Sequence, residues 1–473
     1  MKDFPLIFEL SQAGRRGVQP PLVEGPELAE LLGADNLRGS SLDLPEVDEL
    51  SVVRHYTGLS RRQVGVDTTF YPLGSCTMKY NPKINEEIVK EFYELHPYQD
   101  PGAIQGVLRV YHELQGFLAE LTGMDSVSLQ PAAGAQGELT GILMIRAYHA
   151  SRGDDQQRRV VLVPDSAHGS NPATAAMAGY QVIEVPSGPD GQVDLAALQT
   201  LLSPEVAAVM LTNPNTLGIF EERILEISRL AHGAGAQLYY DGANLNALMG
   251  WVQIGKLGFD VAHLNLHKTF SVPHGGGGPG SGPVAAKAHL APFLPMPLVN
   301  FGPDGYQLDY DRPQSIGSMR SFFGNTGAIV RAWAYIRMLG SAGIKKSAAL
   351  AVLNSSYLKH LLAQIGYTSP YGDSMHEFVA QPPQGLSART VAKALLDRGF
   401  HPPTVYFPLI VTEALMIEPT ETEAPEVLAD FAQALAEIAA LDPTVLAQAP
   451  QSTPVGQLDE TTASRHPQLT HQS

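Results

Sequence analysis

The sequence has a single cysteine, Cys76, so no disulfide can form within the chain. This excludes a disulfide-stapled secreted fold and favours a reducing compartment. The chain also lacks any apolar run approaching the ~18 residues of a membrane span. The apolar stretch in its first segment, MKDFPLIFELSQAGRRG, is too short and too interrupted for the core of a signal peptide. We therefore expect a soluble cytoplasmic protein.

Positive charge is scarce as well. The chain has 31 Lys and Arg residues against 48 Asp and Glu residues, which gives a net charge of −17. Proteins that bind nucleic acid need clustered Lys and Arg, so we expect no nucleic-acid partner. Attraction to anionic lipid is disfavoured too, so we expect no membrane partner. A local pocket for one small phosphate remains compatible with this charge.

The length and composition indicate a globular protein of more than one domain. Hydrophobic residues make up 44% of the 473 residues and charged residues 17%, which is outside the range of disordered chains. A single core rarely grows beyond roughly 250–300 residues. The pattern along the chain predicts four regions: an N-terminal arm at 1–110, a large domain at 111–326, a small C-terminal domain at 327–450 and a polar tail, extended in form, at 451–473.

The predicted arm is rich in turn formers and poor in periodicity. Its segment 68–84, TTFYPLGSCTMKYNPKI, mixes polar, aromatic and small residues and cannot build a core of its own. We therefore expect the arm to wrap a larger body or a partner chain.

The large domain alternates short apolar runs with amphipathic segments. Strands are predicted at 125–130, 158–164, 181–186, 206–212, 236–242 and 261–270, and helices at 138–150, 173–179, 194–202 and 223–235. This alternation predicts an α/β fold with a mostly parallel sheet that is covered by helices on both faces. The small domain is predicted to be α+β, with helices at 328–339, 348–366, 390–399 and 426–441 and a strand at 376–381. Ligands of such sheets bind beyond the carboxyl ends of the strands.

Two residues at predicted strand ends suit pyridoxal 5'-phosphate (PLP) chemistry. Lys268 ends the apolar run VAHLNLHKTF beside His267, where desolvation favours a nucleophilic amine that can carry the cofactor as a Schiff base. Asp241 ends AQLYYDG, and a carboxylate there can pair with the pyridine nitrogen of PLP. The separation, 268 − 241 = 27 residues, is about one strand–loop–strand step. Taken alone, each has an ordinary alternative, a solvated strand-end lysine and a turn aspartate.

Four further features complete a PLP site. The small residues Ala133, Gly134 and Ala135, with Gln136, follow a strand and open a helix, which suits a phosphate. His267 can add a phosphate donor. His168 can stack on the pyridine ring, and Asn213 can donate to its phenolic oxygen.

Three of these assignments have alternatives: tight helix–strand packing for the 133–136 turn, a hydrogen-bonded loop histidine for His168 and an Asn-Pro turn for Asn213. The joint placement of all these residues after different strands of one sheet favours the PLP site. The glycine run HGGGGPGSGP does not match the GxxxxGK[ST] or GxGxxG nucleotide loops. No metal site is predicted.

Long segments of the chain resemble a known family. They are YTGLSRRQVGVDTTFYPLGSCTMKYNP, LQPAAGAQGELTGIL, PDSAHGSNPATAAMAGYQV, LTNPNTLGIFE, YYDGANLNA and HLNLHKTFSVPHGGGGPGSGPV. They are similar to glycine dehydrogenase (decarboxylating), the P-protein of the glycine cleavage system, and the resemblance runs from about Arg54 to Thr422. Many P-proteins have two related halves in one chain. This chain resembles the lysine-bearing half, which occurs separately as subunit 2.

The resemblance implies a fold-type-I PLP enzyme in which Lys268 binds the cofactor and Asp241, His168 and the turn at 133–136 support it. It implies decarboxylation of glycine and transfer of an aminomethyl group to the lipoyl arm of the H-protein. Implied partners are glycine dehydrogenase subunit 1 and the lipoylated H-protein, with the T-protein and L-protein as members of the same system. Ser318 and Thr326 stand where relatives often carry a basic and an aromatic residue.

Two other functions remain open from sequence. One is a different fold-type-I amino-acid decarboxylase, which would protonate the carbanion instead of transferring it. The other is a non-catalytic subunit that only shapes a partner's site. The long N-terminal match disfavours the first, and the presence of Lys268 and Asp241 disfavours the second.

Overall fold

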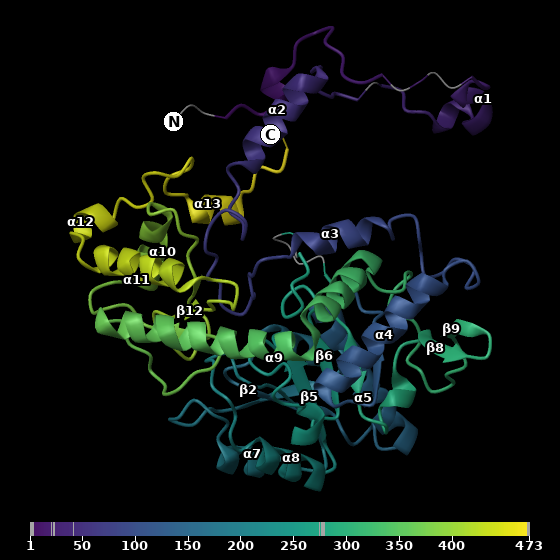
Figure 1. The fold of residues 1–473 in the computed structure, drawn as a ribbon, viewed down its shortest axis with the longest axis vertical. Helices are drawn as coiled ribbons and strands as arrows, with labels where there is room; N and C mark the ends of the chain where they lie inside the picture. The colour runs from purple at the N-terminus through teal and green to yellow at the C-terminus, as the bar shows by residue number, and fades with distance from the viewer. Residues whose placement is uncertain are drawn as a thin grey trace. The chain divides into compact units, whose positions relative to one another are not determined.

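The structure, a computed structural model, describes residues 4–19, 21, 24–40, 42–273, 275 and 280–470. The chain forms two compact units (Figure 1). One is Thr69–Ala447, and the other combines Met1–Thr68 with Gln448–Ser473. The predicted boundaries near residues 110, 326 and 450 stay predictions.

A seven-stranded sheet forms the centre of the larger unit. Its strands are β1 (Ser126–Ser128), β2 (Val160–Pro164), β3 (Gln181–Val185), β4 (Val206–Thr212), β5 (Gln237–Gly242), β6 (Val261–Leu264) and β7 (Val284–Ala286), in the order β1-β7-β6-β5-β4-β2-β3. The run from β6 to β3 is parallel, whereas β7 is antiparallel to both β1 and β6. The predicted mostly parallel sheet is confirmed. The three-residue β7 was not predicted.

Alternate residues of each strand point to opposite faces of the sheet, and both faces are buried except along the edge strand β3. In β5, Leu238 and Tyr240 join one apolar cluster, and Tyr239 joins the other. The first cluster includes residues of α4 (Gln105–Thr122), α8 (Ile224–Gly233) and α9 (Thr326–Gln364), and the second includes residues of α5 (Gly134–Arg152) and α6 (Ser170–Met177). Burial on both faces explains why the strands read as nearly continuous apolar runs. The predicted helix at 194–202 is α7 (Leu195–Leu201).

Helix α9 connects the sheet to the C-terminal part of the same unit. It merges the two helices predicted at 328–339 and 348–366 and bends at Gly340, whose φ of 61° lies in the left-handed region. It packs against α3 (Lys83–Lys90), α4 and α11 (Pro425–Ala439), as Figure 1 shows. At its start, the Thr326 hydroxyl lies 2.9 Å from the hydroxyl of Tyr111.

The C-terminal part contains a small antiparallel sheet in the order β10-β12-β11, made of β10 (Phe378–Ala380), β12 (Leu415–Ile417) and β11 (Thr404–Val405). Helices α10 (Ala388–Leu396), α11 and α12 (Pro443–Leu446) accompany it. This confirms the predicted α+β character. A hairpin of β8 (Leu298–Gly302) and β9 (Gly305–Asp309) lies earlier in the chain.

The segment with the mixed TTFYPLGSCTMKYNP sequence packs on the small sheet. Leu73 pairs with Ile417, and the backbone N–H of Gly74 donates to the oxygen of Met416 over 3.1 Å. Further along, Lys79 forms a buried ion pair with Glu421, with 2.8 Å between Nζ and Oε1. These contacts hold the segment within the larger unit, so it reaches the edge of the cavity described below.

The smaller unit contains α1 (Leu28–Leu32), α2 (Glu49–Ser60) and α13 (Glu460–Arg465). Among the described residues of these three helices, only His55 is buried. The tail was predicted to be extended, but it contains helix α13. The side chain of Asp459 caps this helix by accepting a hydrogen bond from the N–H of Thr462. Within the described parts of the chain, no helix is long and apolar enough to cross a membrane.

Candidate active site

A cavity of about 510 Å³ opens at the carboxyl ends of the parallel strands. It is lined by Thr212 at the end of β4, Asp241 in β5, His263 in β6 and the first residues of α5. The predicted residues that line it are Ala133, Gly134, Ala135, His168, Asp241, His267 and Lys268. The structure therefore brings most of the predicted site together, as the strand-end rule requires.

Lys268 lies beyond the strand that was predicted to end on it. Strand β6 stops at Leu264, and a turn follows in which the N–H of Lys268 donates to the oxygen of Asn265 over 3.2 Å. The prediction of a strand through residue 270 was wrong because the ladder ends where Asn265 begins this turn. The Nζ atom of Lys268 donates to the backbone oxygen of Ser75 over 2.7 Å.

Asp241 is buried and held by three groups. The Nδ2 of Asn171 donates to Oδ2 over 2.8 Å, the N–H of Ala243 donates to Oδ1 over 3.0 Å, and His263 Nε2 lies 3.4 Å from Oδ1. Burial alone would raise the pKa of Asp241, but His263 and these hydrogen bonds outweigh it and hold the pKa below its usual value. Asp241 is therefore a fixed carboxylate at the floor of the cavity.

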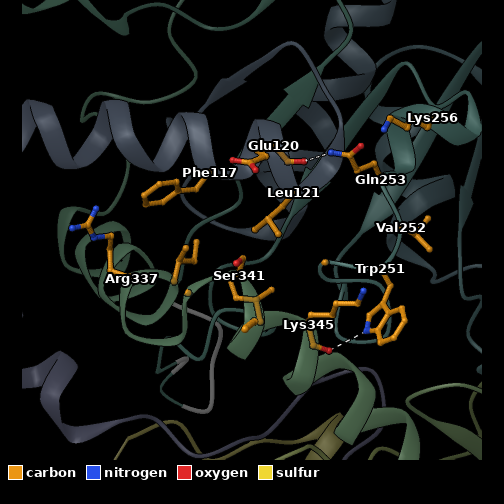
Figure 2. Close-up of a pocket in the computed structure, with 15 residues that line it drawn as sticks. Phe117, Glu120, Leu121, Trp251, Val252, Gln253, Lys256, Arg337, Ser341 and Lys345 are labelled. Atoms are coloured by element: carbon orange, nitrogen blue, oxygen red, sulfur yellow. Dashed lines mark hydrogen bonds between the residues drawn. The ribbon is translucent and has the colours of Figure 1, made fainter.

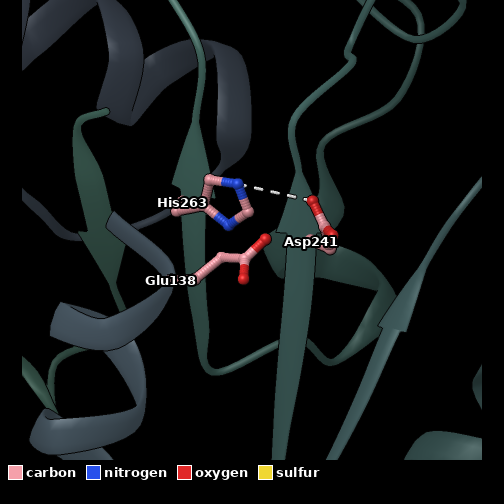
Figure 3. A group of neighbouring side chains, drawn as sticks. All are labelled: Glu138, Asp241 and His263. Atoms are coloured by element: carbon pink, nitrogen blue, oxygen red, sulfur yellow. Dashed lines mark ion pairs between the residues drawn. The ribbon is translucent and has the colours of Figure 1, made fainter. Parts of the chain in front are cut away.

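Glu138 lies close to Asp241 and was missed by the sequence analysis (Figure 3). Its carboxyl group accepts hydrogen bonds from Ser170 Oγ at 2.8 Å, Asn171 Nδ2 at 3.2 Å and Thr174 Oγ1 at 3.0 Å. Burial and the nearby charge of Asp241 raise the pKa of Glu138 to about 8. At neutral pH this side chain therefore carries a proton beside the Asp241 carboxylate.

Glu138, Asp241 and His263 each offer a possible metal-ligand atom, and these atoms lie within 4.8 Å of one another. The hydrogen bonds to both carboxyl groups already occupy most of their acceptor positions, and the other ring nitrogen of His263, Nδ1, lies 2.8 Å from the Tyr239 hydroxyl. The arrangement is accounted for by a hydrogen-bonded network that includes one proton on Glu138.

The start of α5 supplies a tight cradle. Ala133 is its N-cap residue, and a side chain added at Gly134 would place a Cβ atom 2.5 Å from Oδ1 of Asn265. The Oδ1 atom of Asn265 is buried without a hydrogen-bond partner. Gln136 does not line the cavity, because its Oε1 accepts from Ala132 N at 2.7 Å.

His267, His168 and Asn213 occupy different positions. His267 is buried on the cavity wall, and its Nδ1 accepts from the N–H of Ser281 at 3.3 Å. His168 lines an exposed part of the cavity, where its Nδ1 lies 2.6 Å from Ser170 Oγ. The Oδ1 of Asn213 accepts from the N–H of Glu221 at 2.9 Å, and Asn213 is absent from the described lining.

The neighbouring Thr212 lines the cavity instead of Asn213. Its hydroxyl is buried without a hydrogen-bond partner in the described protein. Thr212, the residue just before the Asn-Pro turn, therefore presents a hydroxyl to the cavity.

The opposite wall comes from distant parts of the chain. Ser75, from the segment before α3, and His376 and Glu377, just before β10, face the strand ends. The Ser75 N–H donates to Glu377 Oε2 over 2.8 Å. Sequence reasoning missed these residues because the strand-end rule concerns only the large sheet, and they follow no strand of it.

A second cavity, of about 850 Å³, lies where α9 bends (Figure 2). Its wall is mainly apolar and includes Phe117 and Trp251, whose indole N–H donates to the oxygen of Lys345 over 2.9 Å. It contains none of the predicted site residues. The cavity at the carboxyl ends of the strands is therefore the candidate active site.

Comparison with solved structures defines the class of fold. A glycine decarboxylase (P-protein) of the glycine cleavage system, in inhibitor-bound form, aligns over 87% of this chain and 94% of its own at 24% identity and a TM-score of 0.74. A sphingosine-1-phosphate lyase of Burkholderia pseudomallei covers 86% and 95% at 18% identity and a TM-score of 0.65. The chain has the fold of fold-type-I PLP enzymes.

Sequence relatives narrow the class to one family. Residues 40–308 match the family described as "Glycine cleavage system P-protein", and residues 347–451 match "Glycine dehydrogenase, C-terminal domain". A probable glycine dehydrogenase (decarboxylating) subunit 2 of Thermus thermophilus is 67% identical over 471 residues, 99% of each chain. One of Caldanaerobacter subterraneus is 56% identical over 98% of this chain and 97% of its own. The chain belongs to the P-protein family of the glycine cleavage system, as subunit 2 of glycine dehydrogenase (decarboxylating).

Proposed function

We propose that this chain binds PLP through Lys268, decarboxylates glycine and transfers the remaining aminomethyl group to the lipoyl arm of an H-protein. The observation that carries the proposal is the meeting of Lys268 and Asp241 in one cavity of a chain that belongs to the P-protein family. PLP, when bound, supplies an electron sink for the pair that remains on the glycine carbon after CO2 leaves.

The residues of the cavity fit this cofactor. The backbone at Ala133 and Gly134 opens a helix, and its N–H groups suit a phosphate. The unpartnered hydroxyl of Thr212 is a buried polar group that a bound group would satisfy. His168 lies at the exposed edge, where its ring can cover one face of the cofactor.

Asp241 has the surroundings that its proposed role requires. A carboxylate that stays ionised can hold a proton on the pyridine nitrogen and keep the ring cationic. Asn171 donates a hydrogen bond to Oδ2 of Asp241, and the N–H of Ala243 donates one to Oδ1. The two bonds fix the orientation of the carboxylate. Glu138, which carries a proton, stabilises the arrangement without adding a second negative charge.

A partner chain is part of the proposal, because the relatives are subunits by name. In the smaller unit, the exposed fractions of Leu28, Leu31 and Leu32 of α1 are 62%, 64% and 55%. A helix that exposes all its leucines gains little by folding alone, so it fits an arm that packs on subunit 1. The lipoylated H-protein would supply the acceptor, and the T-protein and L-protein would complete the system. A single cysteine suits the reducing cytoplasm.

Exchange of labelled bicarbonate into glycine tests the proposal, since the exchange requires reversible cleavage of the bond to the carboxylate. The chain is assayed with and without subunit 1 and with and without lipoylated H-protein. Exchange that needs all three proteins is expected. Release of CO2 without an acceptor would favour a simple amino-acid decarboxylase, and full exchange with Lys268→Ala would favour a non-catalytic subunit.

A further inference from the structure

His376 is a buried histidine on the wall of the cavity. It is 2% exposed and lines the cavity, and neither ring nitrogen has a hydrogen-bond partner in the described protein. Its Nε2 lies 3.7 Å from Glu377 Oε1, which is beyond hydrogen-bond distance. Burial lowers the pKa of His376 to about 3, so the ring is neutral and has one N–H to donate. Buried polar groups are normally satisfied, so this ring indicates a ligand.

Glu377 stands beside a second buried carboxyl group, Glu418. The register of the small sheet pairs Phe378 with Ile417, so Glu377 and Glu418 lie side by side just beyond that pair. Both side chains are buried. Two carboxylates at such a position cannot both be ionised without a large penalty, so one of them holds a proton.

The hydrogen bonds show which of the two is charged. Glu418 accepts from Thr77 N at 2.9 Å, Thr77 Oγ1 at 2.8 Å and Asn244 Nδ2 at 2.7 Å. Glu377 accepts from Ser75 N at 2.8 Å. The hydrogen bonds to Glu418 stabilise a negative charge there, so Glu418 is the ionised member of the pair. Burial and Glu418 raise the pKa of Glu377 well above its usual value, and Glu377 is a neutral donor on the cavity wall.

This wall faces the reacting end of Lys268. The Lys268 Nζ donates to Ser75 O over 2.7 Å, and the N–H of the same Ser75 donates to Glu377. In the proposed function the substrate amine takes the place of Nζ, and the inference that follows rests on that function. The substrate carboxylate, only two bonds from the amine, then lies next to this wall.

The neutral side chains of this wall suit the binding of a carboxylate that is lost as CO2. Among the described residues that line the cavity there is no arginine. Loss of CO2 moves negative charge away from the carboxylate, so a strong ion pair would stabilise the bound substrate more than the transition state. Neutral donors orient the group without that penalty. We propose that His376 and Glu377 bind the α-carboxylate of the amino-acid substrate as neutral hydrogen-bond donors.

Binding of two amines tests the assignment without turnover. The PLP-loaded chain, in complex with subunit 1 and without H-protein, is titrated with glycine and with methylamine, which lacks the carboxylate, while the cofactor absorption is followed. His376→Ala should weaken glycine binding by about tenfold or more, the usual effect of losing a hydrogen bond to a charged group. Methylamine binding should change by less than about twofold, since it makes no such bond.

Glu377 and a surface histidine supply the matched comparisons. Glu377→Gln keeps a neutral donor and should retain glycine binding, whereas Glu377→Ala should lose it as His376→Ala does. His360→Ala, on the exposed face of α9, should leave the binding of both glycine and methylamine unchanged. Equal weakening of both amines, or wild-type glycine binding by both alanine variants, would overturn the assignment. If the unaltered complex shows no response to either amine, the proposed function itself fails.

Discussion

The amine of Lys268 and the backbone oxygen of Ser75 lie 2.7 Å apart although the two residues are separated by 193 positions. The contact closes the cavity between the large sheet and the segment that precedes α3. It also places a hydrogen-bond acceptor against the amine, which holds Nζ over the strand ends where the cofactor is proposed to bind.

Lys268→Ala should abolish turnover and remove the visible absorption of lysine-bound PLP. The reason is that no other lysine lines the described cavity. Absorption and reductive trapping with borohydride measure the effect. Lys256→Ala, at an exposed position of the second cavity, is the control and should keep both signals. Trapping of PLP on another lysine of the unaltered chain would refute the assignment.

Asp241→Asn should lower turnover by about tenfold or much more, where each tenfold is ~1.4 kcal/mol of barrier. The amide cannot hold the pyridine nitrogen protonated, so the electron sink weakens more than cofactor binding does. Turnover and PLP affinity are measured in parallel, with Asp304→Asn at an exposed turn as the control. Near-normal turnover would exclude the proposed role.

Gly134→Ala should weaken PLP binding by roughly tenfold or more, because the new methyl group would meet Oδ1 of Asn265 at 2.5 Å and displace the start of α5. Quenching of protein fluorescence by added PLP gives the affinity. Gly116→Ala, also in a helix but with no atom within 4 Å of the new Cβ, should bind PLP normally. Equal affinities of the two variants would argue against a phosphate cradle at α5.

Glu138→Gln should stabilise the PLP-free protein increasingly as pH rises. In the unfolded chain this carboxyl group titrates near its ordinary value of 4.5, whereas in the folded site it holds its proton up to about pH 8. The folded state therefore binds more protons between these values, and its stability falls as pH rises through that window. The slope is at most about 1.4 kcal/mol per pH unit.

The measurement for Glu138 is the melting temperature of the variant minus that of the unaltered protein from pH 5 to pH 8. Glutamine does not titrate, so this difference should grow with pH. Glu87→Gln, at an exposed site, is measured alongside as the control. A flat difference for Glu138→Gln would show that Glu138 is already ionised at neutral pH.

The chain expressed alone should be poorly soluble or inactive, and co-expression with subunit 1 should restore both properties. The exposed leucines of α1 are the physical reason, and the interface should exceed ~2,000 Å² in total, as in obligate complexes. Size measurement and bicarbonate exchange on the same fractions check this. A monodisperse homo-oligomer that performs full exchange with H-protein alone would contradict it.

Local sequence pattern was sufficient to predict the central sheet and part of the site. Apolar strands covered on both faces have a recognisable pattern, and in a parallel sheet the residues after each strand meet at one edge. That local rule was enough to place Asp241, Lys268, His168 and the start of α5 in one cavity. It misjudged the end of β6, where a single asparagine begins a turn, and it chose Asn213 where Thr212 faces the cavity.

The opposite wall of the cavity and the charges on its residues depend on long-range packing and could not be predicted from local pattern. Ser75, His376 and Glu377 reach the cavity because the small sheet and the segment before α3 pack together, which depends on contacts between residues hundreds of positions apart. The proton on Glu138 and the proton on Glu377 depend on burial and on a neighbouring carboxylate, and neither is a property of the residue in its local sequence. Local pattern therefore fixes which groups follow the strands, whereas long-range packing sets what they face and which of them are charged.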